Sequence, residues 1–361
     1  MALTPALFPP APQGVKGRAK ELNALTKRIT EGGVRRIALV GGGGSGKSLL
    51  ACVLGHRLKR YFSGGAHWLR VGAWDTSTLV EMLCRRLGAP GTADISSLKD
   101  SLNRKGPILI VLDNHENDRA LAAFIELLRD CPVTWIITAR RCLLSGVEVF
   151  PVIAPLISSS EAAFPRVAQL TKLLRWNPLA LDIADGLVST KAVSAAALRK
   201  WLLQAGVDRV TVMAHEDDVP EVRLLVAWAW AKLSREARQL LAALAHTEGD
   251  DIDEASLYRL ARIGTDGKAL AALIAWRLIQ QPLLNRYTVH AVVRYAIRQR
   301  TRFPARRFFD HYVKLMERDP ARVRLEQSHL FAAMDYAHQT SDLGAALRIE
   351  RLLALVETQE R

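Results

Sequence analysis

Apolar positions over the first 155 residues follow two different spacings. Five short apolar runs, each typical of a buried parallel strand, lie at 37–40, 67–71, 108–112, 133–138 and 147–153. Between them are stretches with helical spacing at 19–30, 47–62, 76–87, 98–103 and 120–129. This alternation predicts an α/β core, a parallel five-stranded sheet with helices on both faces.

Beyond Pro155 the strand signals give way to helical patterns, which break at Asn177-Pro178. A compact stretch near residue 285 has apolar residues on both sides of a turn at 284–286, and it predicts a β-hairpin. Helices followed by a small hairpin suggest a winged helix. We therefore divide the chain into a flexible tail (1–16), a P-loop domain (17–155), a helical domain (156–217), a winged-helix domain (218–302) and a helical region (303–361).

The bulk composition is that of a globular protein, with 49% hydrophobic and 24% charged residues among 361. We find no run of 18 apolar residues, so no membrane span is expected. The Pro-rich start of the chain does not resemble a secretion signal. The four cysteines form no CxxC pair, and most sit in apolar patterns, which favours reduced thiols. We expect a cytoplasmic protein.

The formal net charge of +14 is concentrated towards the C-terminus. Between residues 286 and 324 three acidic residues face eleven basic ones, namely Arg286, Arg294, Arg298, Arg300, Arg302, Arg306, Arg307, Lys314, Arg318, Arg322 and Arg324. One interpretation is a patch that binds nucleic acid or another polyanion. The other is a solvated helical face, and the sequence leaves both open.

The segment GGGGSGKS matches G-x-x-x-x-G-K-[ST] and lies between an apolar run and a helical stretch, as the motif requires. Glycines let successive backbone N–H groups turn towards phosphate oxygens, and the helix N-terminus adds a partial positive charge. The lysine is expected to reach the β- and γ-phosphates, and the following serine to ligate Mg²⁺. The candidate nucleotide-binding residues are Gly41, Gly42, Gly43, Gly44, Ser45, Gly46, Lys47, Ser48 and Leu49.

Two further strands end in polar residues at the edge of the sheet where α/β proteins bind ligands. ILIVLDN places Asp113 there as a second candidate Mg²⁺ ligand, and Glu116 just beyond it is a candidate for orienting the attacking water. WIITARR places Arg140 where it could contact the γ-phosphate. The candidate catalytic residues are thus Lys47, Asp113, Glu116 and Arg140. The nine histidines show no metal-binding spacing.

The order of these motifs resembles that of the signal-transduction ATPases with numerous domains (the STAND class), and within them the bacterial relatives of the NB-ARC ATPases. VKGRAKEL resembles the entry segment of that group, and TAR its sensor. WNPLAL resembles the helix start whose proline approaches the adenine. YTVHAVVRYA resembles the histidine segment of the winged helix, and residues 330–353 resemble helices that lead into a repeat sensor.

The resemblance implies a slow ATPase that uses ATP/ADP and Mg²⁺ as a switch in signalling, transcriptional control or defence. Arg18 is implied to pack beside the base, Pro178 to approach the adenine, and His290 to donate a hydrogen bond to the β-phosphate of ADP. Self-association on activation and a protein partner or effector are also implied. Nothing precedes residue 16 as an effector, and the helical array stops after about one pair, so we expect either a fragment or partners that supply both parts.

Three departures from the pattern of the group stand out. Asn114 replaces a frequent second aspartate, which leaves Glu116 as the candidate for the water, while Asn177 and Ala291 replace other usual residues. Two hypotheses from other classes remain beside the switch. One is a DNA-handling P-loop ATPase that grips nucleic acid through a basic winged helix, and the other is a binding module whose P-loop is only structural.

Overall fold

The computed structural model describes residues 8–9, 11, 18–72, 74–87, 94–153, 164–207, 218–247, 251–265, 267–323 and 325–358. The chain divides into two compact units between Ala163 and Phe164. Among the helices within these ranges, none is long and apolar enough to cross a lipid bilayer.

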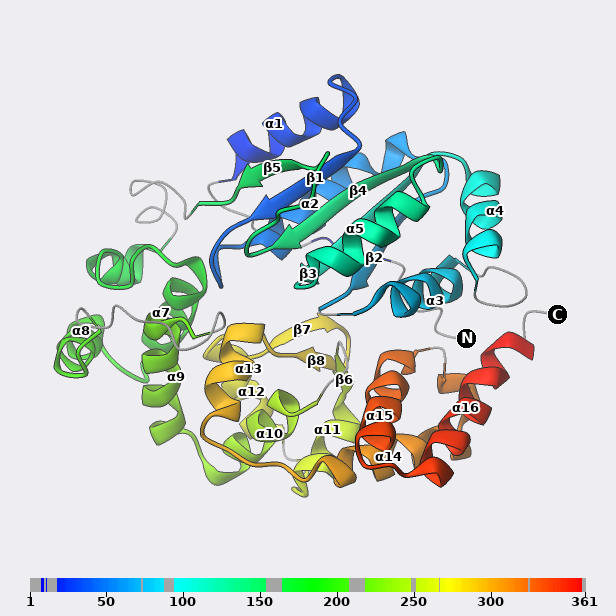
Figure 1. Ribbon diagram of the computed structural model, residues 1–361. Coiled ribbons are helices and arrows are strands. Elements are labelled where there is room, and N and C mark those ends of the chain that lie inside the picture. Colours follow the sequence, from blue (N-terminus) through cyan, green and yellow to red (C-terminus); the bar gives the residue numbers. More distant parts are fainter. Residues whose placement is uncertain are drawn as a thin grey trace. The chain divides into compact units, whose positions relative to one another are not determined.

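The first unit is built on a parallel five-stranded sheet with strand order β2-β3-β4-β1-β5 (Figure 1), as the sequence predicted. The strands are β1 (Arg36–Val40), β2 (Ala66–Arg70), β3 (Ile108–His115), β4 (Val133–Ala139) and β5 (Glu148–Pro151). Because β4 lies between β1 and β3, the carboxyl ends of these three strands meet at one edge. That edge carries the glycine-rich loop after β1 and the polar ends of β3 and β4.

Helices cover both faces of this sheet. Along β1, Ile37 and Leu39 pack into one cluster with α1 (Ala19–Thr30) and α2 (Lys47–Leu58). Ala38, between them in sequence, joins the opposite cluster, because successive strand side chains point to opposite faces. That second cluster contains residues of α3 (Thr76–Leu87), α4 (Ile95–Lys105) and α5 (Asp118–Leu127). The helix α2 ends in a short 3-10 turn, η1 (Lys59–Tyr61).

Two residues of the predicted flexible tail pack against this unit. The Phe8 ring meets His56 and Trp68 edge-on, with ring centroids 5.3 and 5.4 Å apart. His56 Nε2 lies 2.7 Å from the Pro9 carbonyl oxygen. A Cβ at Gly55 would come within 2.2 Å of the Phe8 ring, so a glycine there makes room for it. Most of residues 1–16 lie outside the described ranges, but the chain is held against α2 and β2 at Phe8.

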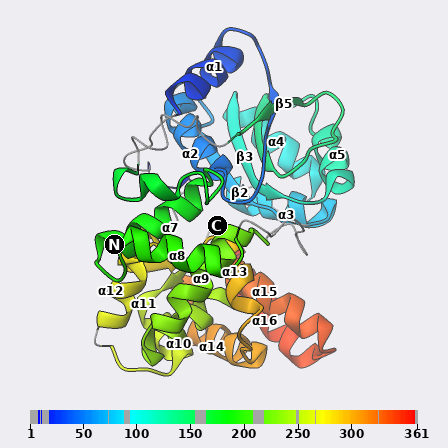
Figure 2. The same ribbon diagram turned by 90° about the vertical axis from the view of Figure 1, so that its left-hand side faces the viewer.

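The second unit is mainly helical. Its helices are η2 (Pro165–Leu170), α7 (Pro178–Ser189), α8 (Ala195–Gln204), α9 (Pro220–Lys232), α10 (Arg235–Ala245), α11 (Glu254–Ala261), α12 (Lys268–Ala275), α13 (Ala291–Arg298), α14 (Ala305–Arg318), η3 (Pro320–Arg322), α15 (Gln327–Gln339) and α16 (Leu343–Thr358). One continuous buried cluster runs from Val167 to Leu353. The predicted helical domain, winged-helix domain and C-terminal helical region therefore share one core. Helices α15 and α16 lie side by side (Figure 2).

A small antiparallel sheet belongs to the same unit. Its strands are β6 (Ile252–Asp253), β7 (Gln280–Leu283) and β8 (Arg286–Thr288), in the order β6-β8-β7. The predicted hairpin is therefore confirmed as the β7–β8 pair. Its turn contains Asn285 at φ 57°, a left-handed conformation that asparagine tolerates better than most residues. The interpretation of these helices and strands as a winged helix stays a prediction.

Candidate nucleotide-binding site

The glycine-rich loop between β1 and α2 has a backbone that side chains would not permit. Gly44 and Gly46 adopt φ values of 75° and 90°, in the left-handed region that favours glycine. At Gly41 a Cβ would lie 2.4 Å from the Val152 carbonyl oxygen, so the loop approaches the chain after β5 too closely for any other residue. The amides of Gly46, Lys47 and Ser48 open α2, where backbone N–H groups have no acceptor within the helix. Such a loop is shaped to receive an anion.

Lys47 lies across this loop. Its Nζ donates to the carbonyl oxygens of Gly41 at 2.8 Å and Gly42 at 2.9 Å. Burial and, after it, the positive charge of Arg140 lower the pKa of Lys47 to about 8, although the negative charge of Asp113 opposes both. An anion placed here would relieve the cost of burying this ammonium group. An effect of this kind requires Arg140, which directly follows β4, to lie near Lys47.

Ser48 and Asp113, the two candidate Mg²⁺ ligands, are in direct contact. Ser48 Oγ donates to Asp113 Oδ1 at 2.6 Å. Thr138 Oγ1, on β4, donates to the same oxygen at 2.6 Å and accepts from the backbone N–H of Asn114 at 2.9 Å. A carboxylate and a hydroxyl at one point are oxygen donors of the kind that Mg²⁺ takes together with phosphate oxygens. The residues present therefore fit a magnesium ion.

Thr138 was missed as a site residue by sequence reasoning, which considered it only as part of a sensor motif. The available signal was a hydroxyl near the end of β4, a strand that is buried along its whole length. A buried hydroxyl needs a partner, and Asp113 on the neighbouring strand supplies it. Thr138 thus fixes one oxygen of the Asp113 carboxylate.

Glu116 follows the end of β3 and has an exposed side chain. Pairing between β3 and β4 becomes irregular between Leu112 and His115, and Asn114 takes a φ of 60° there. Asn114 Nδ2 donates to Glu116 Oε1 at 2.8 Å, and the Glu116 amide donates to the Gly72 carbonyl at 3.0 Å. The departure from a second aspartate therefore has a structural consequence, because Asn114 supplies a donor that holds the Glu116 carboxylate.

Arg18 is bonded to the phosphate loop itself. Its side chain is 5% exposed, and Nη2 donates to the Ser45 carbonyl at 2.7 Å. Nη1 donates to Glu21 Oε1 at 2.6 Å and to the Ile153 carbonyl at 2.7 Å. The guanidinium group thereby ties the loop to the chain that leaves β5. Its expected contact with the base stays a prediction.

Two further residues of this region, Ser45 and Leu49, were candidates from the sequence. The Ser45 hydroxyl is buried, with no hydrogen-bond partner within the described part of the chain. A buried polar atom of this kind calls for a partner, which a nucleotide or water would supply. Leu49, in the first turn of α2, is 43% exposed. The site thus brings together Arg18, the loop from Gly41 to Ser48, Asp113, Thr138 and Arg140.

The remaining two candidates, Pro178 and His290, lie in the second unit. Pro178 is the first residue of α7, and the Asn177 side chain caps that helix by accepting from the Ala180 amide at 3.1 Å. His290 caps α13, where its Nδ1 accepts from the Val292 amide at 3.2 Å. Both residues therefore begin helices, and their contacts with nucleotide stay predictions.

The basic residues between 286 and 324 are engaged inside the protein more than the sequence indicated. Arg286 is 7% exposed and ion-paired. Arg294 and Arg298 donate to the carbonyls of Thr247 and Ala245 at the end of α10, where cations are favourable. Others bind carbonyls or carboxylates, namely Arg300, Arg306, Arg307 and Arg322. Arg324 lies outside the described residues. Much of this charge thus supports the fold.

No family model matches the chain. It is 26% identical to the regulatory protein AfsR of Streptomyces griseus over an alignment of 324 residues, which covers 81% of this chain and 33% of AfsR. The crystal structure of PH0952 from Pyrococcus horikoshii, a STAND protein with a tetratricopeptide repeat sensor, has a TM-score of 0.61 at 17% identity, over 99% of this chain and 56% of that one. The chain thus spans about a third and about half of these proteins. The predicted resemblance to the STAND class is confirmed at the level of the fold, and the chain has the fold of a STAND-class P-loop ATPase. The narrower resemblance to the NB-ARC ATPases stays a prediction.

Proposed function

We propose that this protein is an ATP/ADP-controlled switch that binds Mg-nucleotide in the loop from Gly41 to Ser48 and hydrolyses ATP slowly. The observation that carries the proposal is the meeting of Lys47, Ser48 and Asp113 at one edge of the sheet. Together they supply a cation for phosphates and two oxygen ligands for magnesium. The similarity in fold to a STAND protein supports a switch over a metabolic enzyme.

Each residue has a role in this proposal. Lys47 holds the β- and γ-phosphates, and Arg140 contacts the γ-phosphate. Bound magnesium, held by Ser48 and Asp113, supplies electrostatic stabilisation of the transferred phosphoryl group. Glu116 orients the attacking water once its carboxylate leaves Asn114, so the Asn114–Glu116 bond supports slow turnover. Pro178 and His290 complete the site from the second unit when ADP is bound.

The switch works as a two-state element biased by the nucleotide. ADP holds a closed state, and a signal lets ATP replace ADP, after which opened subunits associate with one another or with a protein effector. The alternative is a DNA-handling ATPase. The intramolecular contacts of Arg286, Arg294 and Arg298 argue against a large free basic surface and favour the switch.

The test is mass spectrometry of nucleotide released when the purified protein is denatured, with Lys47→Ala as the control. We expect adenine nucleotide, mainly ADP, in near-equal amount to wild-type protein and little in the variant. Phosphate release is then measured with and without duplex DNA. Steady hydrolysis that DNA stimulates would favour the DNA-handling ATPase. A protein that neither retains nor binds nucleotide would leave the P-loop only a structural role.

A further inference from the structure

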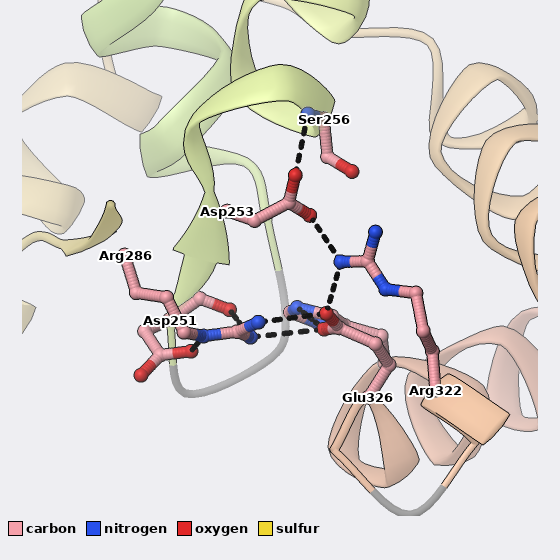
Figure 3. A network of polar contacts seen from close by, with 7 residues as sticks. Asp251, Asp253, Ser256, Arg286, Arg322 and Glu326 are labelled. Carbon is pink, nitrogen blue, oxygen red and sulfur yellow. Dashed lines mark hydrogen bonds and ion pairs between the residues drawn. The ribbon is translucent and has the colours of Figure 1, made fainter. Parts of the chain in front are cut away.

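A buried network of charges joins the small sheet to the C-terminal helices (Figure 3). Arg286, on β8, donates from Nη1 and Nη2 to the two carboxylate oxygens of Glu326 at 2.7 and 2.9 Å. Its Nε donates to Asp251 Oδ1 at 2.5 Å. Arg322 Nη2 bridges Glu326 Oε1 at 2.8 Å and Asp253 Oδ2 at 2.9 Å. Glu326 is therefore shared by two arginines from different parts of the unit.

The Arg286–Glu326 contact in this network is buried, and it fixes the position of the two residues relative to each other. Glu326 is 0% exposed and Arg286 is 7% exposed. Burial by itself raises the pKa of Glu326, but the Arg286 guanidinium holds it below its ordinary value, so the carboxylate is ionised at neutral pH. A buried ion pair adds less stability than an apolar cluster of the same size, and removing one partner leaves an uncompensated charge. The two-pronged Arg286–Glu326 contact, in contrast, fixes distance and orientation together.

The network lies close in sequence to His290, whose proposed hydrogen bond to ADP we call the nucleotide latch. Glu326 directly precedes α15, and Arg322 ends η3. Arg286 begins β8, and His290 caps α13 only four residues later. The residues between them are held as well, since Tyr287 and Val289 are 4% and 1% exposed. A shift of Glu326 relative to β8 would thus be transmitted to His290 over a short, packed segment.

We propose that Glu326 is a positioning residue for His290, which it holds in place for ADP through the Arg286–Glu326 contact and β8. This rests on the proposed function. It makes the C-terminal helices part of the nucleotide latch, because any event that displaces the start of α15 also releases β8. Such an event could be a protein partner that binds α15 or α16.

The test measures the dissociation rate of fluorescently labelled ADP, chased with unlabelled ADP, from the full chain. Glu326→Gln is expected to speed ADP release about fivefold or more, the lower end of ordinary coupling between sites. Glu317→Gln is the matched control, because it removes an exposed ion pair with Arg348 in the same helical region. It should leave the rate unchanged. If Glu326→Gln does not fold, Arg286→Lys is measured in its place, because it keeps the positive charge and loses the two-pronged contact.

A double-mutant cycle separates positioning from general loosening. His290→Asn keeps an acceptor for the Val292 amide but not the ring, and Glu326→Gln should add little to the release rate in that background. Leu198→Ala, in the buried core of α8, is the control for lost stability. Equal acceleration by Leu198→Ala, or full additivity with His290→Asn, would overturn the inference. Absence of ADP binding in wild type would refute the proposed function itself. Faster release with His290→Asn but not with Glu326→Gln would refute only the role of Glu326.

Discussion

Ser48 and Asp113 lie 65 positions apart in the sequence, and the hydroxyl of one donates to the carboxylate of the other at 2.6 Å. A magnesium ion held by both would replace this hydrogen bond with two oxygen ligands. We expect Asp113→Ala to abolish ATP hydrolysis, and Ser48→Ala to raise the Mg²⁺ concentration needed for half-maximal activity. Phosphate release over a Mg²⁺ titration measures both, and exposed Asp130→Asn is the control. Normal hydrolysis by Asp113→Ala would show that the metal is held elsewhere.

The water-orienting role of Glu116 can be separated from nucleotide binding. Glu116→Gln should trap ATP, with affinity retained and turnover lost, because the amide cannot polarise the water as a carboxylate does. Asn114→Ala removes the donor to Glu116 Oε1 and should raise turnover by a few-fold at most, since the contact is exposed. Single-turnover hydrolysis and ATP binding are measured for both. Normal turnover by Glu116→Gln would shift the role to Asn114 or to a partner subunit.

Nucleotide binding should depend on pH through Lys47. Burial lowers its pKa from 10.5 to about 8, so the free protein loses this charge as pH rises through about 8. Bound phosphate favours the charged form, so binding above that pH must take up a proton. Affinity for ADP should then fall by up to about tenfold per pH unit. Calorimetry at pH 7.5 and 9 in buffers of different ionisation enthalpy measures the uptake. If no proton is taken up on ADP binding at pH 9, Lys47 is not the residue that binds the phosphates.

The core of the fold and most of the site could be predicted from the sequence because their signals are local. The apolar run at 108–112 predicts a buried strand, and in the structure its residues pack on both faces of the sheet. The glycines of the phosphate loop likewise indicate by themselves a backbone that side chains would not permit. Thr138 could not be predicted as a site residue, because its role depends on β4 lying beside β3. The two strands follow one another in the sequence, but the sequence does not show the pairing register that brings Thr138 to Asp113.

The charge network was unpredictable for a similar reason. Arg286 and Arg322 counted as surface charges in a basic stretch, since arginines are rarely buried without partners. Their partners are Asp251 directly before β6, Asp253 in that two-residue strand, and Glu326 directly before α15. Only the folded chain brings these three carboxylates to the two arginines. The sequence therefore suggested arginines on the surface, whereas the structure has them in ion pairs within the second unit.

Arg18 offers a test of how the phosphate loop keeps its shape. Arg18→Met should weaken ATP and ADP binding alike, because the Ser45 and Ile153 carbonyls lose their donor and the loop loses its tie to the chain after β5. Leaving the buried Ser45 carbonyl unsatisfied costs about 1–3 kcal/mol, so melting temperature should also fall. Arg18→Lys should restore part of both. A change in base preference without loss of affinity would instead support a contact with the base.

The last prediction concerns His290, whose Nδ1 accepts from the Val292 amide at 3.2 Å. In the neutral ring the proton then lies on Nε2, which makes that nitrogen a donor. A hydrogen bond to a charged phosphate oxygen is worth about 1.5–3 kcal/mol, so His290→Ala should speed ADP release by about one to two orders of magnitude and promote self-association.

The alanine variant also removes a helix cap, and His290→Asn distinguishes the two effects. Asparagine is a good cap residue, so it should recover the stability of α13 while its shorter side chain fails to restore ADP retention. Labelled-ADP release, thermal unfolding and light scattering are measured for both variants. If the asparagine variant retains ADP as wild type does, His290 serves only to begin a helix, and the switch must hold its nucleotide by other contacts.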